Sequence, residues 1–502
     1  RASGLCGGST GEYLRGSRSS CWRRAGKANH EVSGGCPWET RINGDAHPRS
    51  EAGKKTLKLG AEKRLLVAVL LALGLRFLPG GGAALSYVVA AVIALTGRQG
   101  IILAFAVSWF VSFVNPSLVP ETSFTSIGRY VVLASALLSI MLRQRFALRL
   151  RMLTFSVVVL GCVFIAHSIL ISPLVDVSVL KAISWVVTMC VLLAAWAGMD
   201  EAERKRLSDW LFAGLVILLL ISIPFLATGA GFLVNGTGFQ GVMNHPQAFG
   251  PTMALLASWA SAKLLGEKRP RWSMVGLVGI SMAMVVLSEA RTAGLAVVIA
   301  LVVTIISIPV VSGRRVREVL PGVHSPRLWF IAALVVLGLL LMGTTLSGHL
   351  ATFLTKRGDS GSNLVEIYDQ SRGEKIEEMW INIQREPWLG IGFGIASDHT
   401  KMVVDRDPIL GLPTGAVIEK GVMPLAVMEE LGVPIFLFVM AWFAWIIRRA
   451  ARSGVVQLSV LLTAIMINFG ENVFFSPGGL GLLLLILITW TVASNPVGRA
   501  NP

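Results

Sequence analysis

The sequence predicts an all-α integral membrane protein that crosses the membrane many times, and three observations support this class. Apolar residues make up 54% of the 502 residues and charged residues only 15%, against about 25% charged residues in average soluble proteins. The apolar residues form continuous runs and not the alternating pattern of a membrane β-barrel. Short basic clusters separate the runs, so the net charge of +16 reflects membrane topology, and we expect no nucleic-acid partner.

The apolar runs divide the chain into a membrane bundle interrupted by one large loop. Several runs are short for a bilayer, so we expect about 12–14 transmembrane helices. The candidate spans are 65–79, 82–97, 100–114, 129–142, 152–171, 178–198, 208–228, 247–265, 272–288, 292–311, 327–346, 424–447, 455–471 and 477–494. The resulting parts are a basic tail (1–64) that we expect to be disordered, an N-terminal bundle (65–346), a large loop (347–423) and C-terminal helices (424–502).

Loop charges predict the orientation of these spans. With a cytoplasmic N-terminus, basic clusters fall on the inner side at 143–151, 204–206, 263–271, 314–327 and 448–452. The outer loops 115–128, 172–177 and 229–246 contain no Lys or Arg. Because cytoplasmic loops carry the excess of basic residues, we expect both termini to be cytoplasmic and the large loop to lie outside.

Two polar features at the outer ends of helices are candidate functional positions. Arg291 stands where basic residues are disfavoured, and such arginines are costly and often functional. It is either an anion clamp or an arginine that extends to the outer surface. Asn244 and His245 lie in a Gly-rich outer loop, where they either line a polar cavity or belong to a plain turn between helices.

The large loop contains a predicted amphipathic helix. Ile376, Met379, Trp380 and Ile383 recur at helical spacing and form one apolar stripe opposite charged residues. Such a helix is expected to lie along the outer membrane interface, and Pro387 is expected to end it. A tight glycine-rich turn, GIGFG, follows at 390–394.

Three stretches resemble segments of the O-antigen ligase and O-antigen polymerase superfamily of bacterial envelope glycosyltransferases. Residues 288–295 (SEARTAGL) are similar to its Ser-x-x-Arg-(Ser/Thr) segment. Residues 372–394, from Arg372 to EPWLGIGFG, are similar to its Arg…Trp…Pro-x-x-Gly-x-Gly-x-Gly signature. Residues 419–432, with EKG and ELG, are similar to the exit of the family's loop into the next helix. The resemblance covers roughly 150–490.

The resemblance implies a GT-C-like fold in the bacterial inner membrane and a metal-independent glycosyltransferase without a cofactor. Members of the superfamily transfer a glycan from undecaprenyl diphosphate to a hydroxyl of a saccharide or lipid-linked sugar on the outer face. Planar arginine side chains suit diphosphate oxygens, so Arg291 and Arg372 are the predicted diphosphate ligands. Membrane lipids are the other expected partners.

The sequence departs from this family at the expected catalytic base. Family ligases have a histidine before the loop exit, where this chain has none. Glu419 is the nearest proton acceptor, and His399 is the other candidate. Lys420 would lower the pKa of Glu419, whereas apolar neighbours would raise it. Asp405 and Asp407 form an Asp-x-Asp that we interpret as a solvated charge run and not a metal site.

The missing histidine leaves the type of reaction open between ligation to a lipid acceptor and polymerisation of an exopolysaccharide. It also favours one alternative, a non-catalytic component of polysaccharide assembly or export. A transporter of lipid-linked glycans is a third possibility, because many helices with few outer charges suit it. The ionisable residues gather at the outer face and not at the midplane, which argues against transport.

Overall fold

The computed structural model describes residues 49–120, 124–143, 150–234, 236–330, 333, 373–406, 411, 413–416 and 420–494. The chain divides into two units, 1–57 and 58–502. Apart from the first residues of α1, all elements described below belong to the second unit. Arg372, Glu419 and, within the large loop, residues 347–372, 407–410, 412 and 417–419 lie outside the described residues.

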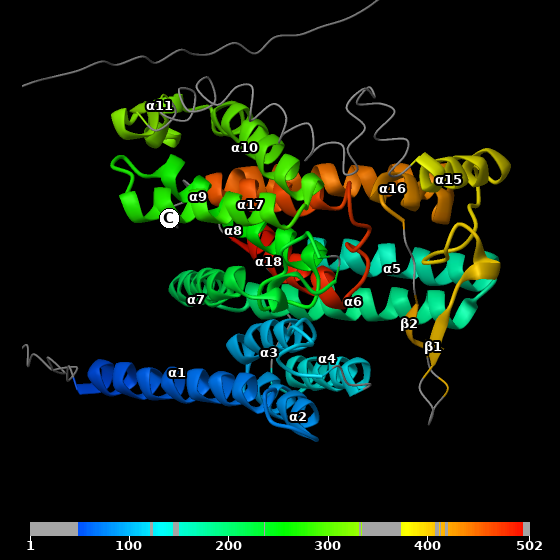
Figure 1. The fold of residues 1–502 in the computed structure, drawn as a ribbon, viewed down its shortest axis with the longest axis horizontal. Helices are drawn as coiled ribbons and strands as arrows, with labels where there is room; N and C mark the ends of the chain where they lie inside the picture. Colours follow the sequence, from blue (N-terminus) through cyan, green and yellow to red (C-terminus); the bar gives the residue numbers. More distant parts are fainter. Residues whose placement is uncertain are drawn as a thin grey trace, which may run out of the picture. The chain divides into compact units, whose positions relative to one another are not determined.

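The described elements are almost all helical, which confirms the predicted class (Figure 1). The longer helices are α1 (Arg49–Leu75), α2 (Gly82–Leu95), α3 (Arg98–Val111), α4 (Phe124–Arg143), α5 (Arg151–Ile171), α6 (Val175–Ala197), α7 (Glu201–Ser222), α8 (Pro246–Gly266), α9 (Trp272–Leu287), α10 (Arg291–Ser312), α15 (Glu374–Arg385), α16 (Met423–Ser453), α17 (Val455–Ile467) and α18 (Gly479–Ala493). Two short strands, β1 (Val404–Arg406) and β2 (Pro413–Ala416), form an antiparallel hairpin.

Apolar patterning predicted these helices well, with one correction at the start. Every predicted span except 327–346, which lies largely outside the described residues, coincides with a helix. Helix α1 begins at Arg49, inside the tail that we expected to be disordered. Its first turns are rich in Lys, Glu, Ala and Leu, which favour a helix even without an apolar face. Residues 1–48 lie outside the described residues.

Helix length and hydropathy agree with a multi-pass membrane protein. Within the described ranges, six helices are long and apolar enough to cross a membrane, namely α4, α5, α6, α7, α10 and α16. Shorter apolar helices are α2, α3, α9, α17 and α18. Outward-facing side chains such as Leu170, Ile217 and Ile306 are large, apolar and exposed. That arrangement suits a lipid environment, where the surrounding solvent is itself apolar.

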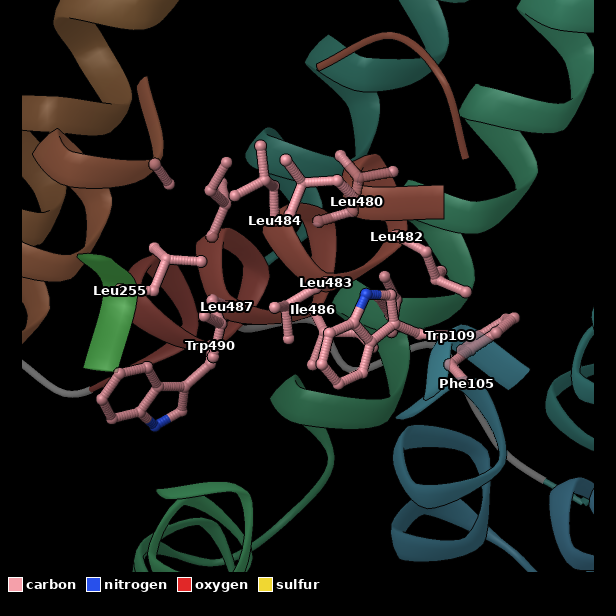
Figure 2. Packing of buried hydrophobic residues seen from close by; sticks show 14 of the residues in the cluster. Phe105, Trp109, Leu255, Leu480, Leu482, Leu483, Leu484, Ile486, Leu487 and Trp490 are labelled. Carbon is pink, nitrogen blue, oxygen red and sulfur yellow. The ribbon is translucent and has the colours of Figure 1, made fainter. Parts of the chain in front are cut away.

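Helix α18 is the centre of the packing. Every residue from Leu480 to Ala493 is buried, as expected for a helix that is apolar on all sides. Figure 2 shows its leucines between Phe105 and Trp109 of α3 and Leu255 of α8. The Trp490 ring stacks on Trp259 of α8, with 4.5 Å between ring centroids. Helices α3, α6, α16 and α17 also contact α18.

Candidate functional site

Helix α16 is broken near its beginning. Gly432 has φ 76° and ψ 166°, and Pro434 follows without a backbone N–H. A break of this kind frees backbone groups that must find partners inside a membrane protein. The glycine-rich segment, residues 387–394, supplies them. Ile391 and Gly392 donate their N–H groups to the carbonyls of Glu429 and Glu430, and Val433 donates to Pro387.

The backbone of this segment lies so close to the backbone of α16 that glycine is required on both sides of the contact. Gly390 has φ 66°, and a Cβ there would lie 2.6 Å from the Glu429 carbonyl oxygen. Gly432 approaches the Trp388 carbonyl so closely that a Cβ would clash with it. Residues 390–394 were expected to form a tight turn, and in the structure the segment is also docked on α16 by hydrogen bonds. Its positive-φ glycines shape this docking.

A closed ionic cluster lies beside the break. Lys420 Nζ is 2.6 Å from Glu429 Oε2 and 3.2 Å from Glu430 Oε1, and all three side chains are at most 4% exposed. Asn382 of α15 donates to Glu429 Oε1 at 2.7 Å. The Gly394 N–H donates to Glu430 Oε2 at 2.6 Å. Each carboxylate oxygen therefore has a partner, as buried charges require.

The cluster changes the interpretation of Lys420. From the sequence we expected this lysine to act on the neighbouring Glu419. In the structure its ammonium lies between Glu429 and Glu430, and Glu419 itself lies outside the described residues. The ion pairs join residues far apart in the chain, so local spacing could not reveal them.

A cavity of about 410 Å³ opens between α3, α4, α6, β2 and the loop after α17. Its volume is within the usual range of ligand sites. Hydroxyl and amide groups line it from several elements: Ser108, Tyr130, Ser184, Thr188, Asn472 and Ser476. Two cations, Arg129 of α4 and Lys181 of α6, also line it, whereas no Asp or Glu of the described residues is among its lining residues.

The β1–β2 hairpin covers one side of this cavity. Pro413, Gly415 and Ala416 of β2 are among the lining residues. Arg406 of β1 forms an ion pair with Asp176 at the start of α6, with 2.6 Å between Nη1 and Oδ2. The large loop therefore contributes directly to the cavity wall. Asp405 lies next to Arg406 on strand β1.

The structure places Arg291 at the first turn of α10. The preceding Glu289 has φ 57°, an uncommon conformation for a residue other than glycine. Thr292 packs so closely on Gly470 that a Cβ there would clash with it. Gly470 belongs to the loop after α17, which also supplies Asn472 to the cavity. Arg291 is thus near a cavity-lining loop without being one of its lining residues.

The other predicted site residues have local roles or lie outside the described residues. His399 is exposed and follows Asp398 in a short 3₁₀ turn. Hydrogen bonds from Thr400 and Lys401 lower the pKa of Asp398 to about 2. His245 caps α8 through its Nδ1, which accepts from Gln247 N–H at 3.0 Å.

Asn244, the other residue predicted to line a cavity, holds two loops together. Its backbone N–H donates to the Phe113 carbonyl at 2.8 Å, while its buried side-chain oxygen accepts no hydrogen bond from the described part of the chain. Neither Asn244 nor His245 is among the lining residues of the cavity between α3, α4 and α6. Their assignment to a polar cavity stays a prediction.

Helix α15 confirms the predicted amphipathic helix and refines its orientation. It ends at Arg385, just before Pro387. Met379 and Ile383 are buried toward the protein, and α15 contacts α16, whereas Trp380 is 49% exposed. The apolar stripe is thus partly used for packing and only partly available to a membrane interface.

The sequence contained signals for the residues that we did not select. Lys181 is a single cation in an otherwise apolar span, and Glu429 and Glu430 stand in another. Ionisable residues in such spans are costly and mark functional or paired groups. Arg129 closely follows the outer loop 115–128, which has no basic residue. Within the described ranges, no group of three or more His, Cys, Asp or Glu side chains could hold a metal ion.

One comparison with known proteins finds a family match over part of the chain. Residues 276–414 match the model of a family described as O-antigen ligase, which confirms the predicted resemblance. The matched region includes Arg291, Arg372, His399 and the glycine-rich segment, and it ends before Glu419. A match to this family suggests ligation or polymerisation of glycans at a membrane. No curated protein matches the chain significantly.

Proposed function

We propose that this chain is a membrane glycosyltransferase that transfers or polymerises a glycan from a polyprenyl-diphosphate-linked donor onto an acceptor hydroxyl at the outer face. The observation that carries the proposal is the O-antigen ligase match, which spans both the Arg291 segment and the glycine-rich segment. The anchoring of the glycine-rich segment on α16 supports it, because a transferase needs a rigidly positioned site.

In this proposal Arg291 and Arg372 bind the diphosphate of the donor. A diphosphate is the leaving group, and its charge grows as the glycosidic bond breaks. Guanidinium groups bind its oxygens in a forked geometry that lysine cannot reproduce. The positions of Arg291 at a helix start and close to the loop after α17 are compatible with a site at the outer ends of the helices.

The test of the proposal is turnover by purified protein. The full chain is reconstituted in liposomes with an undecaprenyl-diphosphate-linked oligosaccharide, and released undecaprenyl diphosphate is measured. A lipid-linked sugar acceptor or the oligosaccharide itself is supplied as acceptor, which separates ligation from polymerisation. Absence of release with every acceptor would favour the assembly component. Movement of the donor across the bilayer without release would favour the transporter.

Arginine variants test the assigned ligands in the same assay. Arg291→Lys and Arg372→Lys each keep the charge and remove the fork, so we expect transfer to fall by about a hundredfold, the typical loss of a transition-state donor. Arg448→Lys, at an exposed position on α16, is the matched control and should leave transfer unchanged. Near-normal transfer by both site variants would show that these arginines are structural or topological.

Two further variants locate the base. If Glu419 accepts the acceptor's proton, Glu419→Gln should abolish transfer while donor binding persists, because the amide keeps the shape and loses basicity. His399→Ala should then be mild. The opposite pattern assigns the role to His399. Transfer that survives both substitutions would mean that neither residue is the base.

A further inference from the structure

A buried histidine of α5, His167, holds the glycine-rich segment from a second helix. Its Nε2 lies 2.6 Å from the Leu389 carbonyl oxygen, and the residue is only 7% exposed. Because a carbonyl oxygen only accepts, Nε2 carries a proton and donates it to this hydrogen bond. The other ring nitrogen, Nδ1, is buried and has no hydrogen-bond partner among the residues that the structure describes. His167 is therefore bound to the segment through one nitrogen.

Close packing accompanies this hydrogen bond. A Cβ at Gly392 would lie 2.9 Å from the Cα of Ser172, the residue that follows α5. The Phe393 ring is buried and stacks on Phe164 of α5, with 4.8 Å between ring centroids. The glycine-rich segment is thus held by the outer end of α5 as well as by α16.

The segment also contacts the loop that lies beside Arg291. Phe393 packs edge-on against Phe475 in the loop after α17, with 6.0 Å between ring centroids. The same loop packs on Thr292, the neighbour of Arg291, so closely that a Cβ at Gly470 would clash. We therefore expect a shift of the glycine-rich segment to move this loop, because packed interiors transmit displacement.

Space filling alone does not explain a histidine at this position. Helix α5 is otherwise apolar enough to cross a membrane, and a histidine in such a span is costly. An apolar side chain would fill the site without leaving a ring nitrogen buried and unsatisfied. What the histidine adds is one directed N–H, to an acceptor 222 residues away in the chain. Directed buried hydrogen bonds specify one arrangement of the groups that they join.

We propose that His167 is a positioning residue of the transferase. Its Nε2–H fixes the glycine-rich segment against α5, and the fixed segment holds the loop after α17 beside Arg291. In this role His167 contacts no substrate and accepts no proton. The effect on transfer rests on the proposed function, whereas the fixation of the segment does not.

Hydrogen exchange of the full purified chain tests the fixation. A glutamine amide nitrogen can reach the place of Nε2, whereas the shorter asparagine amide reaches only the place of Nδ1. In His167→Asn and His167→Phe the backbone amides of Ile391 and Gly392 should exchange roughly threefold to tenfold faster, the usual effect of losing one hydrogen bond. In His167→Gln they should exchange at the natural rate. Cys162→Phe, at an exposed position of the same helix, is the matched control.

Transfer in liposomes, from an undecaprenyl-diphosphate-linked oligosaccharide, tests the role in the reaction. His167→Asn and His167→Phe should lower kcat by roughly threefold to tenfold, for the same lost hydrogen bond. The KM for the donor should not change, because the donor's ligands remain and only their placement in the transition state suffers. His167→Gln should restore kcat. Melting temperatures identify the variants that are folded.

Two patterns would overturn the proposal: natural exchange rates in folded His167→Asn and His167→Phe, or faster exchange with an unchanged kcat. Slow transfer by a folded His167→Gln would also overturn it, since the imidazole would then act through something other than its Nε2–H. A natural chain that transfers no glycan would contradict the proposed function alone, because the exchange rates still decide whether His167 fixes the segment.

Discussion

The closed ionic cluster and the cavity both contain basic side chains, but only the cluster pairs them with carboxylates of the described residues. Lys420 is almost completely buried between two carboxylates, and each carboxylate has a further donor. Lys181 and Arg129 line an open cavity where none of the lining residues that the structure describes is acidic. Satisfied buried charges hold segments in place, whereas charges left without acidic partners suit a ligand. The two regions therefore predict different consequences for the loss of a charge.

The largest expected effect follows from opening the ionic cluster. Lys420→Met leaves Glu429 and Glu430 buried without their cation, which should lower the free energy of unfolding by about 3–5 kcal/mol. Thermal unfolding in detergent, followed by size-exclusion chromatography, measures this loss. Lys205→Met, an exposed lysine, is the control and should be neutral. A stable Lys420→Met variant would show that the cluster does not hold α16 and the glycine-rich segment together.

A smaller effect is expected from the backbone that supports the cluster. Gly390→Ala places a Cβ 2.6 Å from the Glu429 carbonyl oxygen at a positive φ, which should cost about 1–3 kcal/mol. Gly276→Ala is the control, because a Cβ there meets no atom within 4 Å. The same thermal measurement applies. Equal melting temperatures for the two variants would show that the segment relaxes away from α16 without cost.

Removing cations from the cavity should not lower the stability, in contrast to removing the cation of the ionic cluster. Combining Lys181→Met with Arg129→Gln removes two cations that form no ion pair with any described residue, so the ligand-free protein should keep its stability or gain up to about 1 kcal/mol. Melting temperatures of the double variant and the natural chain, measured without lipid ligand, test this. A marked destabilisation would mean that these cations are structural, like those of the ionic cluster.

The smallest expected effect concerns the pH dependence of stability and the imidazole of His245. Desolvation lowers the pKa of His245, whose Nδ1 accepts a hydrogen bond at the start of α8. The unfolded chain then binds the proton more readily, so stability is complete above about pH 6.5 and declines as the pH falls toward the folded-state pKa. His245→Asn keeps an N-cap acceptor and should reduce the change in melting temperature between pH 7.5 and pH 5. His399→Asn should leave that slope unchanged.

Sequence reasoning succeeded for the helices because each depends on a local apolar run. The predicted span 272–288 and helix α9 (Trp272–Leu287) differ by one residue. It could not predict the contacts around the candidate site, whose partners are distant in the chain. Asn382 and Glu429 meet only because the glycine-rich segment folds back onto α16. Lys181 was visible as a lone charge, but only the tertiary structure shows that it forms no ion pair with a described residue.

The break in α16 has a consequence for how the protein is made. The glycine-rich segment is synthesised before α16, yet α16 completes its backbone hydrogen bonds at Glu429 and Glu430 only when Ile391 and Gly392 dock there. Both segments must therefore reach the same side of the membrane. A chain inserted with α15 and the beginning of α16 on opposite sides would retain unsatisfied carbonyls in an apolar setting. Correct insertion and completion of this helix are thus coupled, which gives the cell's quality control a difference to detect.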